Sequence, residues 1–235
     1  MGQENFYVYD GRINPIPCSV RQYVFDDMNR NQSFKFFAGS LSSNSEVWWF
    51  YCSGSSSEID RYVIYNYLEQ VWYYGTLART AWNDRASGSR LFPQAPGTDG
   101  VLYNHENGLD DGSVSPAVPV NAFVQSSDFD IGDGQQFMLV NRIIPDLNFS
   151  DSTATAPQVT LTMGSRNYNG SAAGQGTQSG DVIRSSVVSG KDNYTDQVFM
   201  RLRGRQVNLK VESNTTGVQW RLGAPRLDAR PDGRR

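Results

Sequence analysis

The alternation of apolar and polar positions predicts a β-hairpin over Arg61–Gly75, with the sequence RYVIYNYLEQVWYYG. At a period of two residues, apolar and aromatic side chains fall on both faces of this ribbon. The polar stretch Asn66–Gln70 between the two halves has about the length of a hairpin loop. Tyr65, Trp72 and Tyr74 share one face, and we expect all three to be core residues of the hairpin. A helix is disfavoured because β-branched and aromatic residues dominate the stretch.

Similar patterns predict further strands in the first half of the chain, at Phe6–Gly11, Gln22–Phe25, Phe34–Ser40, Glu46–Ser53 and Val101–Gly108. Tyr9, Tyr65 and Tyr103 each end an apolar stretch and precede Asp or Asn and a turn. Repeats of roughly 40 to 50 residues with several strands each are typical of propeller blades. We therefore predict blades of a β-propeller over residues 1–117, with a meandering β-sandwich as the alternative.

This propeller is expected to be incomplete. Two or three blades fit before residue 118, whereas a propeller needs about four or more. We expect the chain to be the C-terminal part of a longer protein, or to take its missing blades from partners. Blade edges left open in this way would need pairing.

A change of composition at Asp110–Ala122, DDGSVSPAVPVNA, predicts a linker, because Gly, Ser and Pro interrupt regular structure. Strand alternation resumes after it and is clear in Gln158–Met163 and Val198–Val211. We predict that residues 118–235 form a small antiparallel β-sandwich-like domain. The fold class expected for the whole chain is all-β.

The composition agrees with a strand-rich chain without a membrane span. Hydrophobic residues make up 38%, aromatic residues 12% and charged residues 19% of the sequence, so aromatic side chains supply much of the expected core. No run of about 18 apolar residues occurs, and no membrane partner is predicted. Cys18 and Cys52 are too few and too far apart for a metal or CxxC motif, and we expect buried free thiols.

Positive charge gathers at the end of the chain. Residues 198–235 carry nine Lys and Arg against three Asp and Glu, although the whole chain has a net charge of −3. Arg201, Arg203 and Arg205 alternate along one predicted strand and are expected to line one face of it. With Arg221 and Arg226 they are predicted to form an oligomer interface, because Arg is favoured at interfaces and the acidic body offers partners. Nucleic-acid contact is the alternative.

Catalytic motifs are not apparent. His105 is the single histidine, and no serine in a GxSxG setting accompanies it. No phosphate-binding GxxxxGK[ST] or GxGxxG motif occurs, so we predict no cofactor. Trp48, Trp49, Trp72 and Trp82 could form a sugar-stacking platform, but their positions inside strands favour core packing.

Two groups of carboxylates were candidates for chemistry. Asp128, Asp130 and Asp133 resemble a calcium loop, but Gly132 stands where an EF-hand needs an oxygen ligand, and a surface turn is favoured. A second group could in principle supply the carboxylate pair of a glycoside hydrolase, although any acidic chain offers such pairs. This group comprises Asp26, Asp27, Glu58 and Asp60.

Three blocks carry a resemblance to a known family: Val47–Trp82, Ser126–Leu147 and the ending Val218–Arg235, VQWRLGAPRLDARPDGRR. They resemble the C-terminal half of tail nozzle or tail-hub proteins of short-tailed bacteriophages, which are also described as packaged-DNA stabilisation proteins. The resemblance implies a β-propeller with extra β domains, assembled as a homo-oligomeric ring around the DNA exit channel. It also implies other tail and connector proteins as partners, and transient non-specific contact with phage DNA.

From these observations we predict a non-enzymatic virion structural protein. It would be made in the cytoplasm of the bacterial host, form part of the tail tube or nozzle, retain packaged DNA and conduct it during genome ejection. The alternative is a carbohydrate-binding or glycan-cleaving β-propeller used for host attachment.

Overall fold

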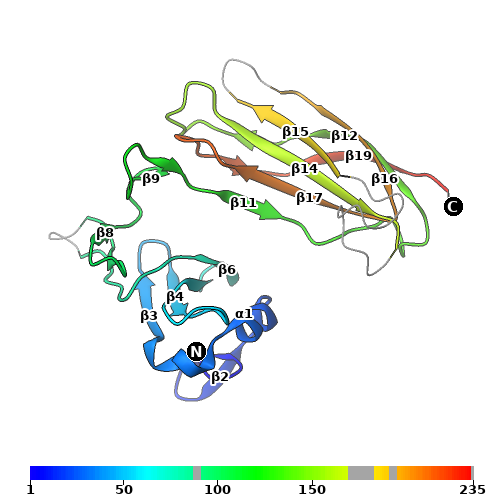
Figure 1. The fold of residues 1–235 in the computed structure, drawn as a ribbon. Coiled ribbons are helices and arrows are strands. Elements are labelled where there is room, and N and C mark those ends of the chain that lie inside the picture. Colours follow the sequence, from blue (N-terminus) through cyan, green and yellow to red (C-terminus); the bar gives the residue numbers. More distant parts are fainter. Residues whose placement is uncertain (87–90, 169–182, 191–194, 234–235) are drawn as a thin grey trace. The chain divides into compact units, whose positions relative to one another are not determined.

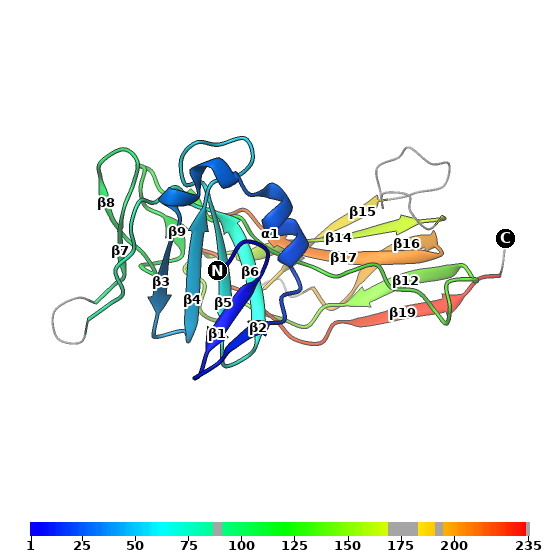
Figure 2. The ribbon, with the colours of Figure 1, turned by 90° about the horizontal axis from the view of Figure 1, so that it is seen from below.

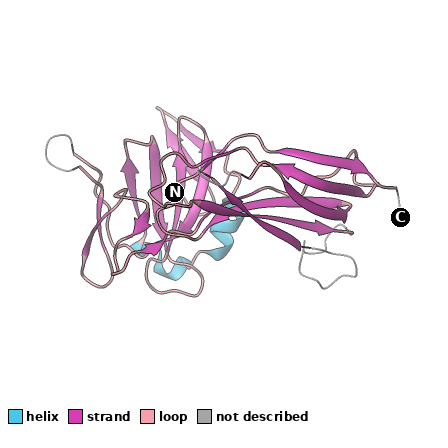
Figure 3. Cartoon of the chain, turned by 90° about the horizontal axis from the view of Figure 1, so that it is seen from above, coloured by secondary structure: helices cyan, strands magenta, loops and turns pink. Residues whose placement is uncertain are grey.

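The computed structural model describes residues 1–86, 91–168, 183–190 and 195–233, and these are mostly β-strand (Figure 1, Figure 3). The chain divides into two compact units, Met1–Asn107 and Gly108–Arg235. Every strand pairing among the described residues is antiparallel. The all-β class is therefore confirmed, and no sheet closes on itself within this part of the chain.

The first unit is built on one four-stranded sheet in which consecutive strands are neighbours (Figure 2). Its strands are β3 (Phe37–Leu41), β4 (Glu46–Tyr51), β5 (Arg61–Asn66) and β6 (Val71–Thr76). Tyr65 lies opposite Trp72, and Val63 lies opposite Tyr74. The predicted hairpin over Arg61–Gly75 and its division into two faces are thus confirmed.

Both faces of this sheet are covered near its centre. On one face, Trp48, Phe50 and Ile64 belong to a buried cluster against which Leu77 and Trp82 pack. On the other face, Tyr51 and Val63 form a second cluster with residues from the start of the chain. That cover comes from β1 (Phe6–Tyr9), β2 (Ile13–Ile16) and α1 (Arg21–Asp27).

The prediction of full burial was wrong for the second strand of the hairpin. β6 is the edge strand of the sheet, and Tyr73 and Tyr74 remain 43% and 45% exposed. Trp72 is half-buried and packs against the cluster that contains Phe6. Alternation alone could not reveal which strand lies at an edge, because both strands of the hairpin carry the same pattern.

The strand predicted at Gln22–Phe25 is a helical turn in the structure. These residues belong to α1, and Val24 and Phe25 are both buried. Neighbouring residues of a strand point to opposite faces, whereas neighbours on a helix can bury on the same side. Packing of this pair onto the sheet therefore outweighs the strand preference of the YVF sequence.

The remaining elements of the first unit are short. The 3-10 helix η1 (Arg30–Lys35) precedes β3, and the two-stranded ribbon β7 (Gln94–Pro96) and β8 (Leu102–Asn104) follows the main sheet. Within the described residues this unit contains a single sheet of four strands. Four antiparallel strands is the number found in one propeller blade.

The second unit has two antiparallel sheets that share a buried core. One sheet has the order β11 (Ala122–Gln125), β17 (Gln206–Ser213), β14 (Gln158–Arg166) and β15 (Ile183–Ser189). The other has the order β16 (Val198–Gly204), β12 (Met138–Ile144) and β19 (Arg226–Pro231). Leu161 and Val211 of the first sheet and Val140 and Leu202 of the second belong to the same core.

The division between the units lies before the predicted one at residue 117. Part of the predicted linker Asp110–Ala122 pairs as β9 (Asp110–Asp111) and β10 (Val118–Pro119). The Asp110 carboxylate accepts hydrogen bonds from the Gly217 amide at 2.8 and 2.9 Å. This contact ties the segment to the second unit. A further short pair in this unit joins β13 (Leu147–Asn148) and β18 (Arg221–Leu222).

Candidate assembly surface

The sheet β16-β12-β19 turns one face to the core and the other outward. Along β16, Val198, Met200 and Leu202 are buried, whereas Phe199 and Arg201 are exposed. This period of two is the alternation that the sequence predicts for Val198–Val211. The arginines of β16 therefore lie on the outer face of the sheet.

A β-bulge interrupts the strand pairing at the centre of this sheet. Between Val140 and Arg142 the register shifts, so that Asn141 lies opposite the two residues Met200 and Arg201. Arg201 has a φ of 47°, in the left-handed region that most residues avoid. The bulge keeps Val140 and Ile143 buried although they are three residues apart. It leaves Arg142 on the outer face, beside Phe199 and Asp228.

We call the outward side of this sheet the arginine face. Its side chains come from all three strands, in pairs that the strand register fixes. Leu139 lies between Arg203 and Arg230, and Ile144 lies beside Arg226. The face comprises Leu139, Arg142, Ile144, Phe199, Arg201, Arg203, Arg226, Asp228 and Arg230.

Charge on the arginine face is only partly balanced within the chain. Arg142 Nε lies 3.2 Å from Asp228 Oδ2, and Arg203 Nε lies 2.6 Å from Asp232 Oδ2. Arg201, Arg226 and Arg230 are exposed and take no part in the ion pairs between described residues. With Asp232, which borders the face and pairs with Arg203, five arginines against two aspartates leave three positive charges.

Apolar side chains accompany these charges. Phe199 is 63% exposed and Ile144 is 41% exposed. Phe137 borders the face and is covered by two guanidinium groups, with the Arg203 group 3.9 Å and the Arg205 group 4.8 Å from its ring centre. Exposed aromatic and aliphatic groups among arginines are the composition found at protein interfaces.

The structure brings together three of the five arginines predicted for an oligomer interface, namely Arg201, Arg203 and Arg226. Arg205 is not on the same strand, because β16 ends at Gly204 and the chain turns into β17. Its guanidinium donates to the Gln135 carbonyl at 2.8 Å. Arg221 lies in β18 and pairs with Asp151 at 2.8 Å.

The five arginines predicted for the interface did not include Arg142 or Arg230, which both belong to the face. Arg230 could have been found from the pattern. In RLDARP, Arg226, Asp228 and Arg230 alternate with Leu227 and Ala229, which pack against the core. Arg142 was hidden by the bulge, since it lies at an even distance from the buried Met138 and Val140.

His105 makes contacts with two side chains of the first unit. Its Nε2 accepts a hydrogen bond from Arg79 Nε at 3.0 Å, and its ring centre lies 5.1 Å from that of Trp82. A nitrogen that accepts from a guanidinium carries no proton to donate. This arrangement holds the imidazole between a cation and an indole ring.

The aspartates of the calcium-like loop form an ion pair and hydrogen bonds with other residues of the second unit. Asp128 pairs with Arg166 at 3.0 Å and accepts from Asn208 Nδ2 at 3.0 Å. Asp130 accepts from Gln206 Nε2 at 3.2 Å, and Asp133 accepts from the Gln135 amide at 3.2 Å. Among the described residues, no group of three or more His, Cys, Asp or Glu side chains is placed to hold a metal ion.

Three of the carboxylates considered for glycoside chemistry also make structural contacts. Glu58 forms an ion pair with Lys35 at 2.5 Å. Asp60 accepts hydrogen bonds from the amide and the hydroxyl of Ser53, both at 2.7 Å. Asp27 lies 3.4 Å from Arg61 Nε in the first unit. Burial, and then the negative charge of Asp27, raise the pKa of the Tyr51 hydroxyl.

The four tryptophans considered for sugar stacking pack within the first unit. The Trp48 ring stacks on Trp82 at 4.9 Å, and Trp49 stacks on Trp72 at 5.9 Å. Core packing, the preferred interpretation, agrees with these contacts. Cys52 is buried as a free thiol, as predicted, whereas Cys18 is half-buried.

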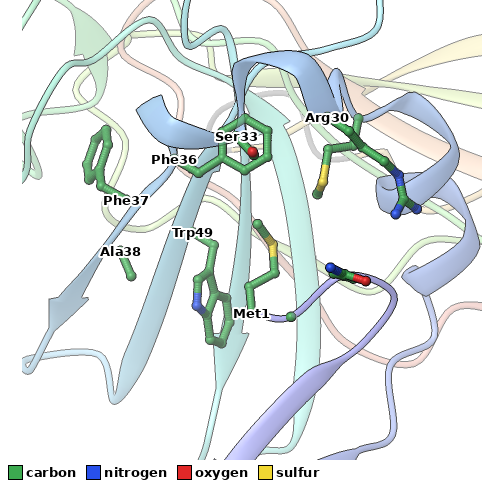
Figure 4. A pocket seen from close by; sticks show the side chains of 10 residues that line it. Met1, Arg30, Ser33, Phe36, Phe37, Ala38 and Trp49 are labelled. Atoms are coloured by element: carbon green, nitrogen blue, oxygen red, sulfur yellow. The ribbon is translucent and has the colours of Figure 1, made fainter.

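An open hollow of about 750 Å³ lies beside η1 and β3 (Figure 4). Met1, Phe36 and Trp49 supply much of its apolar lining, and Gln3, Arg30 and Ser33 supply polar groups. A carboxamide, a guanidinium and a hydroxyl do not make a general acid–base pair. The hollow therefore offers space without evident chemistry.

Comparison of the chain with protein-family models and with curated proteins finds no match. Among the helices of the described residues, none is both long enough and apolar enough to span a bilayer.

Proposed function

We propose that the chain is a non-enzymatic structural subunit that acts by assembling with copies of itself. The observation that carries this proposal is the arginine face, where exposed Phe199 and Ile144 lie among Arg201, Arg226 and Arg230. Such a surface gains free energy when a complementary surface covers its apolar groups and neutralises its charge. His105 and Asp60, which were among the side chains considered for catalysis, are instead held by hydrogen bonds of the fold.

The assembly that we propose is a ring in the tail of a short-tailed bacteriophage. The sequence blocks Val47–Trp82, Ser126–Leu147 and Val218–Arg235 are what supports this choice. In the ring, the sheet β3-β4-β5-β6 would serve as one propeller blade, and other blades would come from the rest of the protein or from neighbouring subunits. The tube would retain packaged DNA and conduct it during ejection, with transient DNA contact and with connector proteins as neighbours.

Negative-stain imaging of the full-length gene product tests this proposal. We expect rings with a central hole, and native mass spectrometry should give one closed stoichiometry. A monomer at micromolar concentration would contradict the proposal. So would turnover of bacterial surface polysaccharide that a single Asp or Glu substitution abolishes, because that result would establish the glycan-cleaving alternative.

A further inference from the structure

Three glutamates gather at one end of the main sheet of the first unit. Glu46 begins β4 and lies opposite Asn66. The Asn66 side chain accepts the amide of Glu69 at 3.0 Å, which places Glu69 in the adjacent turn. Both glutamates are therefore at the end of the sheet where β4 starts and β5 turns into β6.

Glu106 lies near the same end, close enough for its negative charge to act on the Glu46 carboxyl. It follows His105, whose ring lies beside Trp82, and Trp82 stacks on Trp48. Trp48 Nε1 in turn donates to Glu46 Oε2 at 3.0 Å. We call Glu46, Glu69 and Glu106 the glutamate end.

The negative charge of the glutamate end is not balanced by ion pairs between described residues. Burial, and then the negative charge of Glu106, raise the pKa of the Glu46 carboxyl. Exposed apolar groups lie beside it, since Val71 and Tyr73 share the sheet face of Glu46 and are 39% and 43% exposed. A cationic surface with its own exposed apolar groups would complement this end.

We propose that the arginine face of one copy of this chain docks on the glutamate end of a second copy. This inference rests on the proposed self-assembly and names the two surfaces that would carry it. Three positive charges not balanced within the arginine face would meet the three glutamates. Phe199 and Ile144 would cover Val71 and Tyr73, so that both sides contribute apolar area.

A second copy fits the arginine face better than a nucleic acid does. Asp228 and Asp232 lie among the arginines and would repel phosphates, which carry one charge at about every 1.7 Å of a duplex. Phe199 would also gain little from a duplex backbone, because the phosphate–sugar surface is polar and charged. A protein surface with mixed acidic and apolar groups satisfies both parts of the face.

The proposed contact joins two different surfaces, so it is heterologous. Such a contact repeats from copy to copy and closes into a ring when the rotation between copies permits. A two-fold dimer, by contrast, would bring the same surface of each copy together. Variants that each damage one surface can therefore test whether the contact joins two different surfaces or the same surface of both copies.

The experiment uses two charge-reversal variants of the full chain. Arg201→Glu/Arg226→Glu damages the arginine face, and Glu69→Arg/Glu106→Arg damages the glutamate end. Each variant alone should associate at least about 100-fold more weakly than the wild type, because like charges would then face each other. An equimolar mixture should recover association, since the altered face of one variant matches the altered end of the other.

Arg12→Glu/Arg30→Glu is the matched control, because it reverses two exposed arginines that belong to neither surface. Association is measured by mass photometry and native mass spectrometry, and circular dichroism shows that each variant is folded. If a reversal unfolds the chain, Arg201→Gln/Arg226→Gln and Glu69→Gln/Glu106→Gln replace it, and each should weaken association about 10-fold or more.

The outcomes separate this inference from the proposed function. A wild type that does not associate contradicts both. Wild-type rings that form equally well from each variant contradict the docking alone and leave self-assembly in place. Failure of the mixture to recover also overturns the docking. If the arginine variant assembles normally but binds duplex DNA more weakly, with a smaller dependence on salt, the face is a nucleic-acid site.

Discussion

Trp72 and Tyr74 lie on the same strand and face, but their contacts differ. The Trp72 ring lies 4.6 Å from Phe6 and 4.6 Å from Tyr65, and its Nε1 donates to the Pro17 carbonyl at 2.9 Å. Among the described residues, Tyr74 has one ring contact, with Tyr23 at 4.4 Å. Trp72 therefore anchors the start of the chain to the sheet, and Tyr74 contributes to its surface.

Replacing these two residues should have unequal effects on stability. Trp→Ala substitutions cost about 3–5 kcal/mol in buried sites, and half-buried Trp72→Ala should fall near the lower end of that range. Tyr74→Ala should cost about 0.5–1.5 kcal/mol, the size of one aromatic pair. Urea unfolding followed by circular dichroism measures both. Equal losses would show that the exposed and half-buried positions are energetically alike.

The buried Tyr51 hydroxyl should make the stability of the fold depend on pH in the alkaline range. Its hydroxyl is buried and forms no hydrogen bond with the described residues. Because burial raises the pKa of Tyr51 above its ordinary value of 10.0, the folded state holds this proton more tightly than the unfolded state. The resulting stability is present below pH 10 and is lost as the pH rises from there toward the folded pKa.

The Tyr51→Phe variant should remove this part of the pH dependence. At neutral pH it should be neutral or stabilising by about 1 kcal/mol, since it deletes an unpaired buried hydroxyl. Unfolding free energies of variant and wild type between about pH 8 and 11 give the comparison. A variant that loses stability in parallel with the wild type would assign the alkaline effect to other groups.

At the scale of elements, the segment after β6 packs on one face of the main sheet and forms hydrogen bonds with β3 and the turn that follows it. Trp82 Nε1 donates to the Ser40 carbonyl at 2.9 Å, and the Asp84 carboxylate accepts the Ser42 amide at 2.9 Å. A Cβ atom at Gly39 would collide with the indole ring of Trp82. Glycine at this position therefore permits the close approach of the two segments.

Gly39→Ala should cost about 1–3 kcal/mol, because the indole would have to move away from the strand. Gly54→Ala is the control: a Cβ there would meet only the Asp27 carbonyl, at the ordinary distance of 3.4 Å. The control should change stability by less than about 0.5 kcal/mol. Thermal unfolding of both variants decides whether the Trp82 contact limits the space at Gly39.

The sequence could predict these elements only as far as local pattern decides them. The hairpin over Arg61–Gly75 was predictable because its alternation and its polar turn agree. The helix α1 was not, since burial of Val24 and Phe25 against Phe6 depends on contacts far along the chain. The candidate site was only partly predicted for the same reason. The order of the strands places β16 and β19 on either side of β12, and the bulge at Asn141 brings Arg142 to the outer face.

At the scale of the whole molecule, each unit has its own buried core, and their net charges differ. The core of the second unit runs from Met138 to Val211, whereas the two clusters of the first unit use residues before Asn107. Residues 1–107 contain eight Lys and Arg against eleven Asp and Glu, and residues 108–235 contain thirteen of each kind. An acidic unit followed by a unit with one cationic face suits head-to-tail contact between copies.

This arrangement predicts that association depends on acid and on salt. Docking on arginines would lower the pKa of Glu46 relative to the free chain. A group whose pKa is lower in the complex stabilises the complex above its free-chain pKa, and that stability is lost as the pH falls. Because burial and Glu106 raise the pKa of Glu46 in the free chain above its ordinary value of 4.5, its contribution should begin to fade above that pH.

Mass photometry between about pH 7 and 4 should therefore show association weakening as Glu46 takes up its proton. Raising the ionic strength from about 0.1 to 1 M should weaken it too, since the screening length falls from about 10 to 3 Å. Tryptophan fluorescence at each condition verifies that both units remain folded. In Glu69→Gln/Glu106→Gln, association should be weaker at neutral pH, because two negative charges are lost from the glutamate end. Association that stays constant to about pH 4 in the folded wild type would contradict docking on these carboxylates.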